Sequence, residues 1–156
     1  MFRILSLTIL NQTKKVMRKN KFFLAVIVGA VAIFLLGFLT YGIILRDSLH
    51  NQMMAGVERD QPIFWIMIVS HFVWAYFLVL NFSSWSDIST PSAGAMRGAM
   101  IAFLVSVSID AIWYGHSHVM KKWGVIMDVA AWTVSNAIVG AIIGWILGMN
   151  KKSTAS

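Results

Sequence analysis

Two aspartates stand inside otherwise apolar stretches of this sequence, and they are the residues best suited to chemistry. Asp110 lies near the end of one apolar run and Asp128 near the start of the next. An aspartate at the centre of a lipid-crossing helix costs about 2.5–3.5 kcal/mol, so such residues usually face the protein interior and mark function. Two carboxylates buried close together cannot both stay ionised cheaply. The pair predicts a proton-coupled site, a cation site or a pocket for a small basic ligand.

Three further polar side chains complete the set of ligand or ion-binding candidates. His71 and Tyr41 are expected near the depth of Asp110 and Asp128, in two other apolar stretches. Because the reference pKa of histidine is near physiological pH, His71 is a candidate switchable partner of the aspartates. Asn136 lies deeper in the last apolar stretch and adds an uncharged polar group.

Each of these residues also has an ordinary structural explanation. Asp128 stands in the early turns of its helix, where a carboxylate complements the positive end of the helix dipole. Asp110 could be neutralised by Arg46 or by a protonated histidine. His71, among aromatic residues, is often simply a hydrogen-bonded core residue. Both kinds of interpretation stay open at the level of sequence.

Metal and cofactor chemistry have little support in the sequence. His116 and His118 are weak candidates for metal ligands, since they could join the two aspartates around a divalent ion. Their His-x-His spacing suits a strand better than a helix, and no HExxH motif is present. The chain has no cysteine, which excludes thiolate sites and disulfides. We expect no metal and no cofactor.

The composition indicates that lipid surrounds these residues. Hydrophobic residues make up 58% of the 156 residues and charged residues only 12%, whereas a soluble domain carries about 25% charged residues. The net charge of +7 is not a nucleic-acid signal, because the basic residues cluster at the ends of apolar runs. We expect anionic lipid headgroups as their partner and no nucleic acid.

The apolar runs predict an all-α integral membrane bundle of four transmembrane helices. A hydrocarbon core about 30 Å thick needs roughly 20 apolar residues in a helix. Four segments meet this length, and they form one domain over residues 22–149. The expected spans are residues 22–45, 62–82, 91–114 and 123–149. Residues 1–21 form a basic N-terminal segment and residues 150–156 a short tail, both expected in the cytoplasm.

The distribution of lysine and arginine predicts the orientation. With both termini inside, nine basic residues lie on the cytoplasmic side and four on the other side. This excess favours both termini in the cytoplasm. Lys121 and Lys122, in the loop expected outside, argue against it.

The first 21 residues have two interpretations. Apolar residues followed by a basic run are typical of a short interfacial helix on the cytoplasmic leaflet. Alternatively, translation begins at Met17, and residues 1–16 are not native.

Small residues recur every fourth position in the last two spans and predict close helix packing. The glycines concerned are Gly94, Gly98, Gly140, Gly144 and Gly148. If the hairpin is folded about Val119, Gly94 lies opposite Gly144, Gly98 opposite Gly140, and Asp110 opposite Asp128. This is the pattern of a glycine zipper. The stripe of the last span could instead face a second copy of the chain.

The sequence resembles the small bacterial four-helix membrane proteins grouped as domains of unknown function. The resemblance rests on Gly29-Ala30 and Gly37-x3-Tyr41-Gly42, on Ala111-Ile112-Trp113-Tyr114, and on the glycine stripe that begins at Asn136. It covers residues 22–148 and implies the architecture, with no activity. With it, we expect a multi-pass protein of the bacterial cytoplasmic (inner) membrane.

Two functions compete at this level. The first is the binding or transport of a cation, a proton or a small ligand at the Asp/His layer, in an oligomer because four helices leave little room for a pathway. The second is a non-catalytic accessory or scaffolding subunit that contacts a membrane protein partner. An enzyme is not favoured, since no nucleophile motif, ligand cluster or phosphate loop is present.

Overall fold

The part of the chain that the structure describes is helical. The computed structural model describes the backbone of residues 2–57, 59–86 and 88–149, and the side chains of these from residue 19 onward, except that of Trp85. Within these ranges the one β interaction is an isolated antiparallel bridge between Met53 and Met120. The all-α fold class is therefore confirmed, whereas the predicted tail of residues 150–156 lies outside the described residues.

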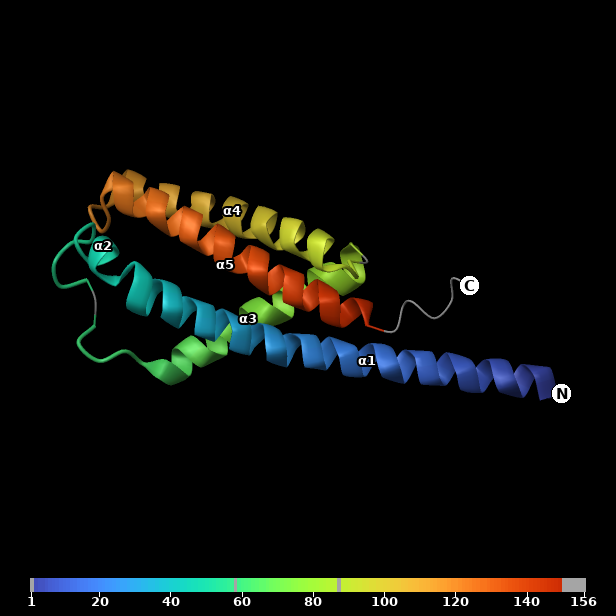
Figure 1. The fold of residues 1–156 in the computed structure, drawn as a ribbon. Coiled ribbons are helices and arrows are strands. Elements are labelled where there is room, and N and C mark those ends of the chain that lie inside the picture. The colour runs from blue at the N-terminus through green and yellow to red at the C-terminus, as the bar shows by residue number, and fades with distance from the viewer. Residues whose placement is uncertain (1, 58, 87, 150–156) are drawn as a thin grey trace.

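The first helix is longer than a single membrane span. α1 covers Phe2–Gly37 and continues into a π-helical segment, η1, over Phe38–Ile44. Neither proline nor glycine occurs between residues 2 and 28, so nothing breaks the helix there. The segment expected as a separate interfacial helix instead forms the first turns of α1 (Figure 1).

The remaining helices follow in antiparallel order. They are the short α2 (Arg46–His50), then α3 (Phe64–Leu80) with its π-helical end η2 (Asn81–Trp85), α4 (Pro91–His116) and α5 (Lys122–Gly148). We call the end that carries α2 and the α4–α5 turn the loop end, and the end where α5 finishes the terminal end (Figure 1).

The start of α4 is encoded locally. Thr90 has an extended backbone, and its hydroxyl accepts a hydrogen bond from the N–H of Ala93 at 3.3 Å. Pro91 occupies the first turn, where no N–H is needed for the helix. This cap fixes the point at which the chain turns back from α3 into the α4–α5 hairpin.

Two loops are tied together at the loop end. The N–H of Met54 donates to the carbonyl of Val119 at 2.9 Å, and the N–H of Lys121 donates to the carbonyl of Gln52 at 2.8 Å. The connection between α2 and α3 is thereby held against the α4–α5 turn.

Helices α4 and α5 approach each other at glycines. A Cβ added to Gly94 would collide with the carbonyl oxygen of Gly140 and would lie 3.2 Å from the Cα of Gly144. One added to Gly98 would collide with the carbonyl oxygen of Asn136 and would lie 3.1 Å from the Cα of Gly140. The backbones are therefore in direct contact, and the facing pairs 94 with 144 and 98 with 140 are those given by folding the hairpin about Val119.

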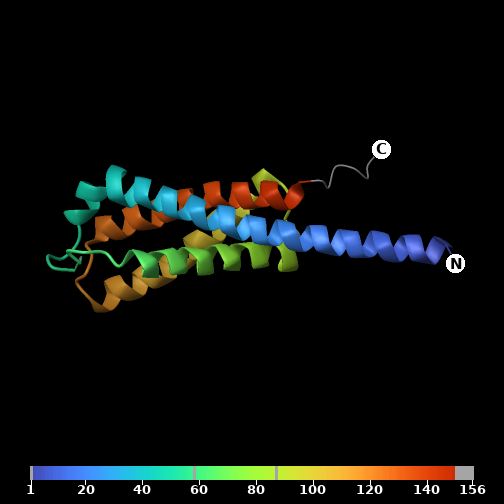
Figure 2. The same cartoon turned by 90° about the horizontal axis from the view of Figure 1, so that it is seen from below.

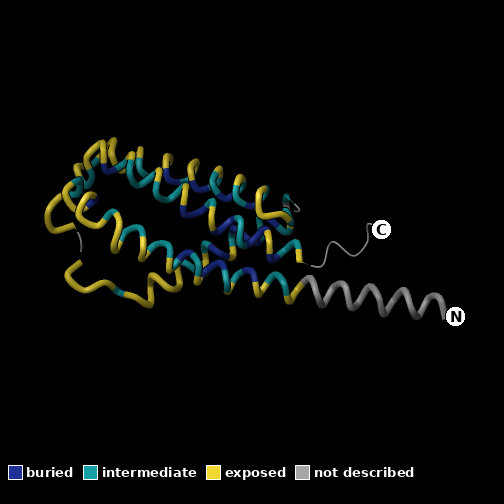
Figure 3. The backbone as a smooth tube through the Cα atoms, viewed as in Figure 1, coloured by how far each residue is buried: buried dark blue, intermediate teal, exposed yellow. Residues whose placement is uncertain are grey.

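The best-packed region lies between α1, α3 and α5, toward the terminal end (Figures 1 and 3). Its fully buried side chains include Leu78 and Phe82 from α3 and its extension, Val139 and Ile143 from α5, and Ala25 from α1. Helix α4 packs chiefly against α5. At the loop end α1 and α5 diverge in Figure 1, and α3 begins there below α1 and crosses it toward the terminal end. Figure 2 shows the same three helices from below.

Four helices are long and apolar enough to cross a membrane. They cover Lys19–Ile44, Phe64–Ser84, Pro91–His116 and Lys122–Gly148. Each matches one expected span to within a few residues at either end. Large apolar side chains cover the outside of all four, such as Trp65 and Met96, which are 68% and 73% exposed. Such a surface suits lipid rather than water, and the four candidate spans indicate a multi-pass membrane protein.

Candidate functional site

Asp110 of α4 and Asp128 of α5 meet near the loop end of the bundle. Their carboxyl groups lie within hydrogen-bonding reach of each other. The contact follows from the packing below it, because the small residues Gly98, Ala102 and Ser106 are all buried on one face of α4 and Asp110 is the next residue on that face. The short α4–α5 turn then brings Asp128 to the same depth.

Tyr41 joins the two aspartates from the third side. It belongs to η1, and its hydroxyl lies within hydrogen-bonding reach of the Asp128 carboxyl. In η1 the backbone bonds to the carbonyl five residues back, as the N–H of Leu45 does to the carbonyl of Thr40 at 2.8 Å. Three separate elements therefore supply the oxygen atoms of this cluster, which we call the acidic site (Tyr41, Asp110, Asp128).

One carboxyl oxygen of the acidic site has no hydrogen-bond partner among the described residues. Oδ2 of Asp110 is buried and has no hydrogen-bond partner within the described part of the chain. A buried polar atom without a partner is costly, and in native proteins it calls for a proton, an ion or a water. Among the described residues, the charged side chain that acts on Asp110 is Asp128, not Arg46 or a histidine. The structural ion pair considered for Asp110 is therefore not formed.

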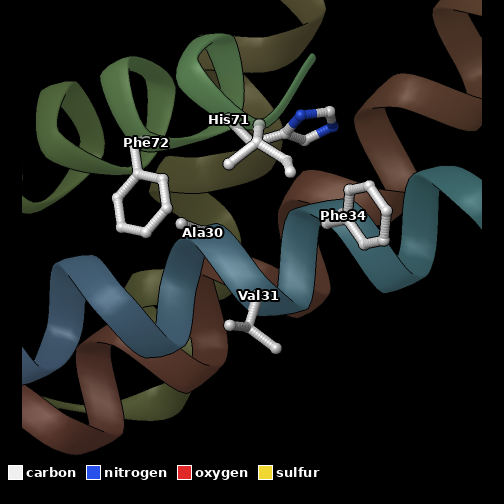
Figure 4. A pocket seen from close by; sticks show the side chains of 6 residues that line it. Ala30, Val31, Phe34, His71 and Phe72 are labelled. Atoms are coloured by element: carbon white, nitrogen blue, oxygen red, sulfur yellow. The ribbon is translucent and has the colours of Figure 1, made fainter. Parts of the chain in front are cut away.

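His71 is not part of the acidic site. Its Nδ1 donates to the carbonyl of Met67 on the same helix, and its ring meets that of Phe34 edge-on at 5.8 Å. A Cβ on Gly37 would lie 3.7 Å from its Nε2, which places the imidazole against α1 (Figure 4). It thus lies in the seam between α1 and α3, while the aspartates face α5 and α4.

Asn136 occupies the centre of the bundle, and both ends of its amide are used internally. Its Oδ1 accepts a hydrogen bond from Nε1 of Trp74 at 2.7 Å, and its Nδ2 donates to the carbonyl of Trp132 at 2.9 Å. The side chain is only 1% exposed. These bonds join α3 to α5 and give Asn136 a packing role in this structure.

The two loop histidines lie apart from the acidic site. Nδ1 of His116 donates to the carbonyl of Ile112, and its ring lies 5.2 Å from that of Trp113. His118 is exposed in the α4–α5 turn. Within the described residues no three histidine, aspartate or glutamate side chains gather as a metal site would require.

Two features of this region were not predicted from the sequence. The π-helical turn that presents Tyr41 has only an indirect signal, the glycines Gly37 and Gly42 on either side of it. The bond from Trp74 to Asn136 has none, because spacing along a helix fixes depth and does not fix which neighbour a side chain faces. No family model, curated protein or solved structure matches the chain, so the chemistry of the acidic site follows from its geometry alone.

Proposed function

We propose that this membrane protein binds a small cation or a proton at the acidic site. The observation that carries the proposal is the buried, unpartnered Oδ2 of Asp110 beside the carboxyl of Asp128. Two carboxyls within hydrogen-bonding reach repel each other when both are charged. A shared proton or a bound cation removes that repulsion and gives the orphan oxygen a partner.

The donor set fits a hard cation. Carboxylate and hydroxyl oxygens are the ligands that hard cations take in proteins, and soft metals prefer sulfur or nitrogen. The acidic site offers two carboxyl groups and one phenol, all from helices that contain long apolar spans. Because an intramembrane carboxylate is costly unless it is compensated, its retention at this depth favours a role in ion binding or transport.

The setting of the site supports a transport protein of the bacterial inner membrane with both termini in the cytoplasm. Basic residues gather at the terminal end, including Lys21 of α1 and Arg97 of α4, as the positive-inside rule requires for this orientation. In that orientation the acidic site lies in the half of the bundle nearer the periplasm.

The scaffolding alternative loses one of its supports. The glycine stripe of α5, which could have faced a second copy, is covered within the chain. A Cβ on Gly144 would collide with the carbonyl of Thr90, and one on Gly148 with the carbonyl of Ser89. We therefore assign this glycine zipper to the packing of α5 on α4 rather than to an oligomer contact.

The test is ion-dependent thermal stability of the full-length protein in phosphatidylcholine nanodiscs. Chlorides of sodium, potassium and choline are compared at equal ionic strength in wild type, Asp110→Asn, Asp128→Asn and, as control, Asp47→Asn, an exposed aspartate of α2. Stabilisation by sodium or potassium over choline in wild type and Asp47→Asn, lost in the two site variants, supports a cation site.

The same variants separate a proton from a metal ion. Asparagine imitates a protonated carboxyl, so a site that holds a shared proton leaves Asp110→Asn as stable as wild type, without an ion response in either. Asp110→Leu then lowers the stability, since it removes both oxygens beside Asp128. If no ion stabilises the wild type and Asp110→Leu is as stable as wild type, the proposal is wrong, and co-purification of a distinct membrane partner would favour the accessory role.

A further inference from the structure

Two hollows adjoin along the seam between α1 and α3, and they differ in chemistry. The one at the loop end has a volume of about 620 Å³, and its lining includes Tyr41 and Gly42 of η1, the two arginines Arg46 and Arg59, and Pro62, Ile63, Ile66 and Met67. The second has a volume of about 190 Å³ and is lined by Ala30, Val31, Phe34, Ile68, His71 and Phe72. Because Met67 lines the first and Ile68 the second, the hollows follow each other along α3.

The loop-end hollow is positively charged. Arg46 begins α2 and Arg59 precedes α3, so the two guanidinium groups come to the same hollow from opposite ends of one loop. Asp47 and Asp60, their neighbours in sequence, do not line it. Two arginines beside a cavity suit a phosphate group, since each guanidinium can donate two parallel hydrogen bonds to its oxygens.

The second hollow is apolar in spite of its histidine. The Nδ1 of His71 is bonded to the carbonyl of Met67 on the same helix. Figure 4 shows the imidazole across from the ring of Phe34, with the Phe72 ring over Ala30. The walls that remain are hydrocarbon and aromatic, and Val31 and Phe72 are 51% and 40% exposed, so the hollow opens to the outside of the bundle.

The two arginines stand where a lipid headgroup would be. The apolar spans end at Ile44 in η1 and begin at Phe64 in α3, so Arg46 and Arg59 lie just beyond the hydrocarbon length of both helices. A phosphate at that level belongs to the membrane surface, and a basic pocket between helices at that level is suited to an anionic lipid. The apolar hollow continues from it toward the terminal end, in the direction that an acyl chain takes.

We propose that the seam between α1 and α3 binds an anionic phospholipid, with its phosphate between Arg46 and Arg59 and one acyl chain along Ile66, Ile68 and Phe72. The chemistry shared with free phosphate is the anion between two arginines. The acyl chain distinguishes the two ligands, because inorganic phosphate gains nothing from the apolar hollow. Asp110 and Asp128 do not line this hollow, whereas Tyr41, the third member of the acidic site, does.

Native mass spectrometry of the delipidated full-length protein in detergent tests the proposal. The probes are short-chain phosphatidylglycerol, phosphatidylcholine of the same chain length, and inorganic phosphate. Wild type is compared with Arg46→Gln/Arg59→Gln and with Lys122→Gln, which removes an exposed charge at the same end without touching the hollow. We expect the double variant to lose on the order of tenfold in affinity for phosphatidylglycerol, with no change in Lys122→Gln.

A second pair of variants tests the acyl chain. Ile68→Gln places a polar group in the apolar hollow, and Val69→Gln makes the same change at a neighbouring exposed position outside it. Retention of phosphatidylglycerol should fall several-fold in Ile68→Gln and stay unchanged in Val69→Gln. Circular dichroism and thermal unfolding of each variant establish that it is folded. If the double arginine variant is not, the single variant Arg59→Gln, in a loop, is used instead.

Three results would overturn the proposal. Equal retention of phosphatidylglycerol by wild type and the arginine variants would show that the arginines do not bind it. Equal binding of phosphatidylcholine and phosphatidylglycerol by wild type would show ordinary lipid coating of an apolar surface. Arginine-dependent binding of inorganic phosphate as tight as that of the lipid would identify the ligand as a free anion.

Discussion

The indole Nε1 of Trp74 donates a 2.7 Å hydrogen bond to Oδ1 of Asn136, and this bond ties α3 to α5 in the middle of the bundle. The ring of Trp74 also lies 5.6 Å from that of Trp132, whose carbonyl accepts from Nδ2 of Asn136. Hydrogen bonds between membrane helices contribute on average about 0.6 kcal/mol and at most about 1.7 kcal/mol. The pair is therefore a modest contribution to stability and a strong constraint on helix rotation.

Trp74→Phe should lower the free energy of unfolding by about 1 kcal/mol, since it removes the donor but keeps an aromatic ring against Trp132. Asn136→Leu should be worse, because leucine fills the site and leaves the indole N–H without an acceptor. Unfolding in mixed detergent micelles measures both. Equal stability of Trp74→Phe and wild type would mean that the bond adds nothing to stability.

Because the backbones of α4 and α5 are in contact, glycine-to-alanine changes at different positions of α4 should lower the stability by different amounts. In Gly94→Ala the new methyl group would collide with the carbonyl of Gly140, a backbone atom that cannot move aside cheaply. The expected loss is about 3 kcal/mol, toward the upper end for overpacking. Gly115→Ala on the same helix meets nothing within 4 Å and serves as the control. Detergent unfolding of both should show near-wild-type stability for the control alone.

The hydroxyl of Tyr41 should contribute to ion binding at the acidic site. Tyr41→Phe removes the hydroxyl that lies within reach of Asp128, so the ion-dependent rise in thermal stability should shrink several-fold while the fold is kept. Tyr114→Phe, an exposed tyrosine at the end of α4, is the matched control. An unchanged ion response in Tyr41→Phe would remove the phenol from the site and leave the two aspartates.

Part of the acidic site could be predicted from the sequence, namely the contact between its two aspartates. The contact of Asp110 with Asp128 is a matter of register, because a short turn and antiparallel helices fix which residues share a depth. Whether a residue at the right depth joins the acidic site depends on the rotation of its helix, which no pattern within a single helix determines. His71 has the right depth but faces Phe34 of α1. The overall fold was more accessible, since span length and hydropathy depend on composition alone.

Substitutions at Gly56 should change the stability through the backbone conformation and not through packing. Its φ is 80°, and a Cβ there would have nothing within 4 Å. Gly56→Ala should therefore destabilise through backbone strain alone, by roughly 1 kcal/mol. Gly56→Asn should cost less, because asparagine tolerates the left-handed region. Detergent unfolding distinguishes them, and equal losses in both would indicate a cause other than φ.

Lys21 predicts a local effect at the terminal end. Its Nζ donates to the carbonyl of Met149, just past the end of α5, where helix carbonyls otherwise lack partners. Lys21→Met should speed amide hydrogen exchange in the last turn of α5 several-fold and leave the middle of the helix unchanged. Lys19→Met, at an exposed position, should have no effect. Unaltered exchange in Lys21→Met would mean that the lysine does not hold this helix end.

The π-helical segment η1 has a consequence for chain length. An α turn holds about 3.6 residues, and the five-residue bonding of η1 accommodates about one residue more. Residues 38–44 thus contain the equivalent of one inserted amino acid. Deleting one residue from this segment would leave α1 as far as Gly37 in place. The helical residues after the deletion would rotate by about 100°, which takes Arg46 away from its hollow. A chain shortened by one residue before Tyr41 should therefore lose both the reach of Tyr41 to Asp128 and the place of Arg46 beside the hollow.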